Sequence, residues 1–135
     1  MEFLDANIFI RHLTNDDPQK AQACFALFEQ AERHEVELTT SEAVIAEVVY
    51  ILSSRATYGV PRTDIRALLY PLVSLPGLKL PHRRMYLRAL DIYASTNLDF
   101  EDALTVAHME RQHITQVVSY DRDFDRIQHI TRREP

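Results

Sequence analysis

Apolar and polar residues along the chain follow two kinds of period. Short apolar or β-branched runs predict strands over residues 2–4, 36–39, 78–80 and 115–119, with a last strand near Ile130. Between them, apolar residues recur every three to four positions. Helices are therefore expected over residues 6–13, 18–34, 42–55, 61–72, 82–95 and 99–112, with a short helical turn over 121–127.

Strands that alternate with helices indicate an α/β fold, in which a parallel sheet is covered by helices on both faces. With 135 residues and 46% hydrophobic residues, the chain is expected to form one domain, residues 1–135, with an ordinary core. Its two glycines, Gly59 and Gly77, are far apart, which excludes the glycine-rich loops of dinucleotide and P-loop sites.

The charge and the cysteine content limit the kinds of partner and the cellular compartment that are expected. The net charge of −5 argues against a nonspecific coat on nucleic acid, although acids that bind metal would weaken this argument. The basic residues are nearly all arginine, and Arg11, Arg83, Arg84, Arg122 and Arg126 are candidates for phosphate contacts. A single cysteine, Cys24, and the lack of a long apolar run predict a cytoplasmic protein without membrane contact.

Glu47 is the acid that fits its helix least. From Ala43 to Leu52 all residues except Glu47 are apolar, so this helix is expected to be buried. An ionised carboxylate in such a place is costly unless it is paired or binds metal. The ordinary alternative is a narrow solvent-exposed stripe on the helix.

Three further acids lie at the ends of predicted elements. Asp5 follows the first strand, Asp121 follows the strand over 115–119, and Asp102 lies one turn into the helix that begins near Asp99. Each has an alternative role as a helix cap or turn residue. Taken together with Glu47, they predict a site for a hard divalent cation and metal-assisted phosphoryl chemistry.

At these acids the sequence resembles the PIN-domain family, and within it the VapC-like toxin ribonucleases of type II toxin–antitoxin systems. The matching segments are Leu4-Asp5-Ala6-Asn7-Ile8, residues 45–52 around Glu47, Glu101-Asp102-Ala103-Leu104 and residues 118–125. The resemblance implies a three-layer α/β/α sandwich with a central, mainly parallel sheet. It also implies a Mg²⁺- or Mn²⁺-dependent endoribonuclease that cleaves RNA, an antitoxin partner whose tail blocks the site, and a homodimer.

The resemblance also assigns roles to individual residues. The acidic quartet would be Asp5, Glu47, Asp102 and Asp121. Metal ligands would be Asp5, Asp102 and Asp121, and supporting residues would be Asn7, Ser119 and Asp123. Glu47 is expected to orient or deprotonate the attacking water. Whether Asp121, Asp123 or Asp125 completes the site is left open.

Other acid-based folds fit less well. A dehalogenase-like phosphatase needs a second aspartate where Asn7 stands, and both that class and receiver domains need a lysine near the last strands, where none occurs. Paired histidines for a zinc hydrolase are also missing. Two alternatives stay open: a non-toxin PIN nuclease acting in RNA maturation or on structured DNA, and a catalytically silent metal-binding interaction module.

Overall fold

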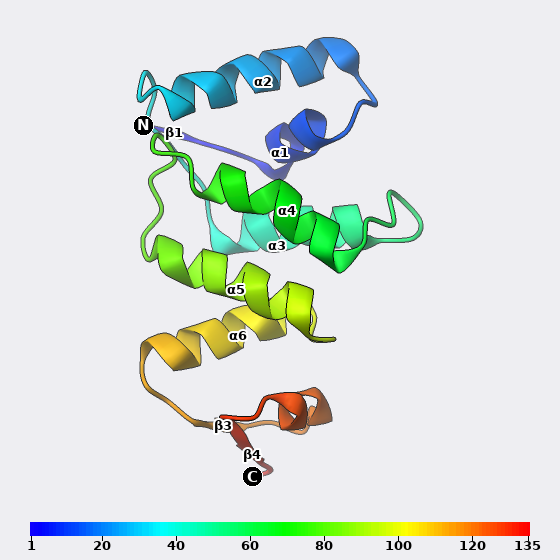
Figure 1. The fold of residues 1–135 in the computed structure, drawn as a ribbon, viewed down its shortest axis with the longest axis vertical. Coiled ribbons are helices and arrows are strands. Elements are labelled where there is room, and N and C mark those ends of the chain that lie inside the picture. Colours follow the sequence, from blue (N-terminus) through cyan, green and yellow to red (C-terminus); the bar gives the residue numbers. More distant parts are fainter.

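The computed structural model describes all of residues 1–135, and in it six α-helices are joined to four short strands (Figure 1). In chain order the elements are β1 (Glu2–Phe3), α1 (Ala6–Leu13), α2 (Pro18–Glu32), β2 (Leu38–Thr39), α3 (Glu42–Ser53), α4 (Arg62–Val73), α5 (Arg83–Ser95), α6 (Phe100–Arg111), β3 (Gln116–Val118), the 3-10 helix η1 (Arg122–Arg126) and β4 (Thr131–Arg133). The six expected helices are present, and the α/β class with parallel strands is confirmed.

The strands are divided between two small parallel sheets. β1 pairs with β2, which is extended by a single bridge from Leu38 to Leu78, while β3 pairs only with β4. The expected strand over 78–80 is reduced to that bridge. Figure 1 shows α3, α4, α5 and α6 between β1 and the β3–β4 pair along the long axis of the molecule. The two sheets are therefore separate in this structure.

Helix starts follow the local chemistry of the sequence. The Ser41 side chain caps α3 by accepting from the N–H of Val44, and the Asp17 side chain caps α2, which begins at Pro18. The helices then pack in pairs, α1 on α2 and α3, and α5 on both α4 and α6. Their inward faces form one hydrophobic core that includes Phe9, Ile45 and Leu90.

The turn between α4 and α5 is held by close backbone contacts. A Cβ on Gly77 would lie 2.6 Å from the carbonyl oxygens of both Ala31 and Val36, so no larger residue fits there. The guanidinium of Arg83 donates to the carbonyl oxygens of Val73 and Leu75, at 3.0 and 2.8 Å. Arg83 is thus part of the framework, and its candidacy for a phosphate contact is not supported.

The length and polarity of each helix decide whether it could cross a membrane. None of them combines the length and the apolar character that crossing a bilayer requires.

Candidate functional site

An acidic group is formed where the start of α6 lies near η1. Asp99 precedes α6, and its side chain accepts a hydrogen bond from the N–H of Asp102 at 2.8 Å. This is one half of the capping arrangement suggested by their spacing. The cap leaves the Asp102 carboxylate free, and no hydrogen bond from a basic side chain reaches it.

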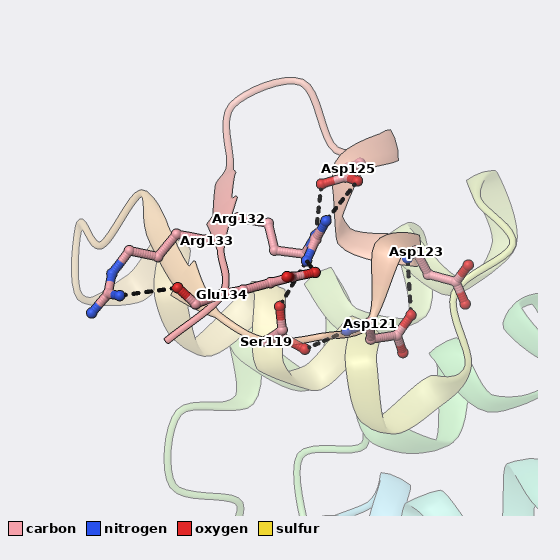
Figure 2. A network of polar contacts seen from close by, with 7 residues as sticks. All are labelled: Ser119, Asp121, Asp123, Asp125, Arg132, Arg133 and Glu134. Atoms are coloured by element: carbon pink, nitrogen blue, oxygen red, sulfur yellow. Dashed lines mark hydrogen bonds and ion pairs between the residues drawn. The ribbon is translucent and has the colours of Figure 1, made fainter.

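The η1 segment brings more carboxylates to the same place. The Asp121 carboxylate accepts from the N–H of Asp123 at 2.9 Å, and the N–H of Asp121 donates to the hydroxyl of Ser119 at 2.9 Å. Figure 2 shows the Asp121 and Asp123 side chains on one side of this segment and Arg132 on the other. Ser119 therefore orients Asp121 through the backbone.

Asp125 has a different neighbour. Arg132 donates to its two carboxylate oxygens at 2.9 and 3.4 Å, and also to the carbonyl oxygen of Ser119 at 2.9 Å (Figure 2). The carboxylate is thus neutralised by a cation on β4. Of the three aspartates in this segment, Asp121 and Asp123 remain beside Asp102, and Asp125 does not.

Partial burial and nearby like charges both raise the pKa of Asp102. Partial burial is the largest cause that raises its pKa, followed by the negative charges of Asp99 and Asp121, and together with Asp123 these raise the pKa to about 6. A carboxyl group whose pKa is raised in this way is unfavourable in these surroundings as an isolated anion. A cation placed against it would remove both the repulsion and the desolvation cost.

Asp5 lies between the end of β1 and the start of α1. It occupies the N-cap position, but its side chain caps no backbone N–H, so the ordinary capping role is not realised. The side-chain amide of Asn7 donates to Asp5 over a long contact of 3.4 Å. The carboxylate is exposed and available to a ligand.

Glu47 lies on an exposed stripe of α3. Ala43, Glu47 and Tyr50 are exposed, whereas Ile45, Val48 and Val49 are buried. The expectation that Glu47 is buried was therefore wrong, because the apolar face of α3 is wide but not complete. The Glu47 carboxylate still has no hydrogen-bond or ion-pair partner.

The structure brings only two acids of the quartet together. Asp102 and Asp121 lie together, whereas neither Asp5 nor Glu47 is among the charges that act on Asp102. No group of three or more histidine, cysteine, aspartate or glutamate side chains is close enough to hold a metal ion. The donors are the carboxylate oxygens that Mg²⁺ and Mn²⁺ prefer, so the chemistry of the set fits such an ion.

Arg62 is a residue that the sequence pattern did not single out. Its guanidinium donates to the carbonyl oxygens of Tyr93 and Leu98 at 2.9 and 2.6 Å, and it lies 4.3 Å from the ring centre of Tyr93. It thereby holds the turn that leads into α6 and Asp102. Nothing in the local sequence signals this role, because its partners lie more than 30 positions away.

A basic cavity of about 600 Å³ opens between the start of α5 and the end of α6. Its lining includes His82, Arg84, Arg88 and Arg111, with Glu110 as the one acid. Glu110 is paired with Arg88 at 2.8 Å, so Arg84 and Arg111 are left as unpaired arginines. Such a cavity is suited to phosphate groups.

Comparison with known proteins assigns the family. Among curated proteins, no relative matches this sequence. The sequence profile of the PIN domain does match, and the match runs over residues 3–130, nearly the whole chain. It covers all four acids of the quartet. This protein therefore belongs to the PIN domain family, whose members are generally metal-dependent nucleases.

Proposed function

We propose that this protein is a metal-dependent endoribonuclease and the toxin of a toxin–antitoxin pair. The observation that carries the nuclease proposal is the position of Asp102 beside Asp121, where partial burial and the neighbouring carboxylates together raise the pKa of Asp102 to about 6. Such a cluster is stabilised by a divalent cation, and family membership makes a phosphodiester the expected substrate.

The proposed ligands are Asp5, Asp102 and Asp121, with Mg²⁺ or Mn²⁺ as the ion. Asp123 supports the set from η1, and Asn7 and Ser119 orient Asp5 and Asp121. Asp125 is left out because Arg132 already neutralises it.

The proposed reaction is in-line hydrolysis of an RNA phosphodiester. An ion held by these carboxylates would lower the pKa of water and offset the negative charge that develops on the phosphate. Glu47, exposed and unpaired, orients the attacking water and accepts its proton. The new P–O bond forms as the bond to the 3′-oxygen breaks, and that oxygen takes up a proton. The products carry 3′-hydroxyl and 5′-phosphate ends.

The substrate is held by cations at some distance from the reacting phosphate. Asp102 and Arg111 lie on the same helix, about 13 Å apart along its axis at 1.5 Å per residue. An RNA strand of a few nucleotides spans this distance. Arg84 and Arg111 would then bind its phosphates, which offsets the repulsion from a chain of net charge −5.

The toxin assignment rests on the resemblance to VapC-like proteins at the four acidic segments. In this proposal an antitoxin binds the site with a tail segment and prevents access of RNA. The acidic cluster at the start of α6 and the unpaired arginines at its other end offer such a tail both a polar target and a basic anchor.

The test is cleavage of total cellular RNA by purified, antitoxin-free protein in the presence of Mg²⁺ or Mn²⁺, and in EDTA. The Asp102→Asn variant, purified in the same way, controls for contaminating ribonuclease. Discrete fragments that need metal and are absent with the variant support the proposal. Fragments from both proteins indicate contamination, and cleavage of structured DNA alone would place the protein in a different branch of nucleases. Metal binding without cleavage of either substrate would favour the silent interaction module.

A further inference from the structure

A small cavity opens where the end of α3 meets the start of α6. The Glu42 carboxylate at the start of α3 lies 3.0 Å from Nε2 of His108 near the end of α6, so the two helices run side by side in opposite directions. Tyr50, near the end of α3, therefore lies close to Asp99 and Glu101 at the start of α6. These three residues line one cavity of about 120 Å³, named here the α3–α6 cavity.

The Tyr50 side chain forms an exposed wall of this cavity. It is 71% exposed, whereas Val49 and Phe100, which also line the cavity, are buried. An aromatic ring held on a helix beside apolar side chains is a surface on which an unpaired nucleobase stacks. The cavity is smaller than the roughly 300–1,000 Å³ of sites for drug-sized ligands, so it is suited to a single base.

Two carboxylates that line the cavity have oxygens available as acceptors. Asp99 uses Oδ1 to accept from the N–H of Asp102, which leaves Oδ2. Glu101 is exposed, and the hydroxyl of Thr105 donates at 3.1 Å to its main-chain carbonyl and not to its carboxylate. A carboxylate accepts from the exocyclic amino group of cytosine, whereas uracil has a carbonyl oxygen at the same ring position and offers no proton there. The cavity therefore favours a base that carries an amino group.

The α3–α6 cavity lies one helical turn from proposed reacting groups on both of its helices. On α3, Tyr50 follows Glu47 by three residues, and both are exposed. On α6, Asp99 precedes Asp102 by three residues and is bonded to its N–H. Three residues correspond to about 4.5 Å along a helix axis, a distance that one nucleotide spans. A strand laid along α6 can thus place a base in the cavity, the adjoining phosphate at Asp102 and later phosphates near Arg111.

We infer that the α3–α6 cavity is a base-recognition subsite, in which an unpaired base stacks on Tyr50 and donates its exocyclic amino group to Glu101. The inference rests on the proposed function, which supplies RNA as the ligand. A base in a duplex is stacked on its neighbours and its amino group is already paired, so double-stranded RNA does not fit. Tyr50 thus selects single-stranded RNA, and Glu101 selects cytosine over uracil beside the cleaved bond.

A tryptophan in place of Tyr50 reports stacking without any use of activity. The chain has no tryptophan, so Tyr50→Trp in an Asp121→Asn background, which prevents cleavage, carries one indole. A cytosine-rich single strand with Mg²⁺ should quench its fluorescence, and the same strand annealed to its complement should not. Phe25→Trp in that background, at an exposed position on α2, is the matched control and should show no quenching. Quenching of both indoles, of neither, or by the duplex as well would overturn the inference.

The choice between cytosine and uracil tests Glu101. In Asp121→Asn protein, fluorescence anisotropy of labelled strands should show cytosine bound about tenfold more tightly than uracil in the same sequence. Glu101→Gln should bring the two affinities together, because an amide both donates and accepts. Tyr50→Leu should weaken both about tenfold. Glu32→Gln, a change at an exposed acid on α2, is the control and should keep the preference. Equal affinities before substitution, or a preference that survives Glu101→Gln, would overturn the role of Glu101.

Failure of the cavity and failure of the nuclease give different results. Metal-dependent cleavage of RNA by the wild-type protein, without quenching at position 50, would keep the nuclease and overturn the cavity. Quenching by single strands in a protein whose wild type cleaves no RNA would keep the cavity and count against the nuclease. If both hold, 5′-phosphate ends mapped in cellular RNA should lie beside unpaired cytosines more often than beside uracils, and Glu101→Gln should lose this bias.

Discussion

Asp99 accepts a hydrogen bond from the N–H of Asp102 at 2.8 Å, and its charge also helps to raise the pKa of the Asp102 carboxyl. One side chain thus stabilises the start of α6 and destabilises the anion that this helix presents. The two effects act on different groups of the same residue, the backbone N–H and the carboxylate. In the absence of metal, the start of α6 is therefore a compromise between capping and charge repulsion.

The stability of the metal-free protein should depend on pH through Asp102. Its pKa rises from an ordinary 3.8 to about 6 on folding, so the folded state binds more protons in this range. The free energy of unfolding should therefore fall as the pH rises from about 4 to about 6. Asp102→Asn should raise Tm in EDTA above pH 6, and the gain should shrink towards pH 4.

Thermal unfolding in EDTA over this pH range provides the measurement. Asp64→Asn, a change at an exposed acid on α4, serves as the control and should show no such gain. If the Asp102→Asn variant is already unfolded at every pH, the Asp102 side chain instead supports the helix.

Substitution of Asp121 and substitution of Asp125 should have different effects on activity and on stability. Asp121→Asn should lower kcat about 100-fold or more while Tm changes little, because a proposed metal ligand is removed. Asp125→Asn should leave the rate near that of the wild type and lower Tm only slightly, because it weakens an exposed pair with Arg132 that solvent screens. Single-turnover cleavage and thermal unfolding of both variants separate the two effects. Equal losses of rate would mean that Asp125 also belongs to the site.

Arg62 should act on the site through α6. Arg62→Ala removes charged hydrogen bonds to the carbonyl oxygens of Tyr93 and Leu98, and is expected to lower the free energy of unfolding by about 2 kcal/mol. Arg62→Lys should recover part of the stability, since one ammonium can reach fewer carbonyls. Urea unfolding gives the stability of each variant, and a loss within 0.5 kcal/mol of zero, on the order of ordinary surface changes, would contradict this role.

The basic cavity should govern affinity for RNA and leave the chemical step unchanged. Arg84→Ala and Arg111→Ala together should raise KM several-fold with kcat nearly constant, because they remove phosphate contacts that are equal in ground and transition states. The salt dependence of binding should also become shallower. Lys79→Ala, a change to a cation outside the cavity lining, is the control. A fall in kcat without a change in KM would mean that these arginines act in the chemistry.

Local patterns were sufficient to predict the helices and most of the strands. Ser41 and Asp17 start helices because their side chains satisfy free N–H groups close by in the sequence, and the strand at Gln116–Val118 follows from a β-branched run. The four acidic segments, that around Asp102 among them, also indicated the correct family. Such features depend on residues that are near each other along the chain.

The positions of the helices, the α/β class and the PIN family follow from the amino-acid sequence. Three other features emerge only when the chain is folded: Glu47 is exposed, Arg132 neutralises Asp125, and Asp102 lies beside Asp121. The reason is that capping and periodicity act over a few residues. The pairing of side chains and strand edges depends instead on how the helices direct the chain through space, and that path is set by the packing of the whole core.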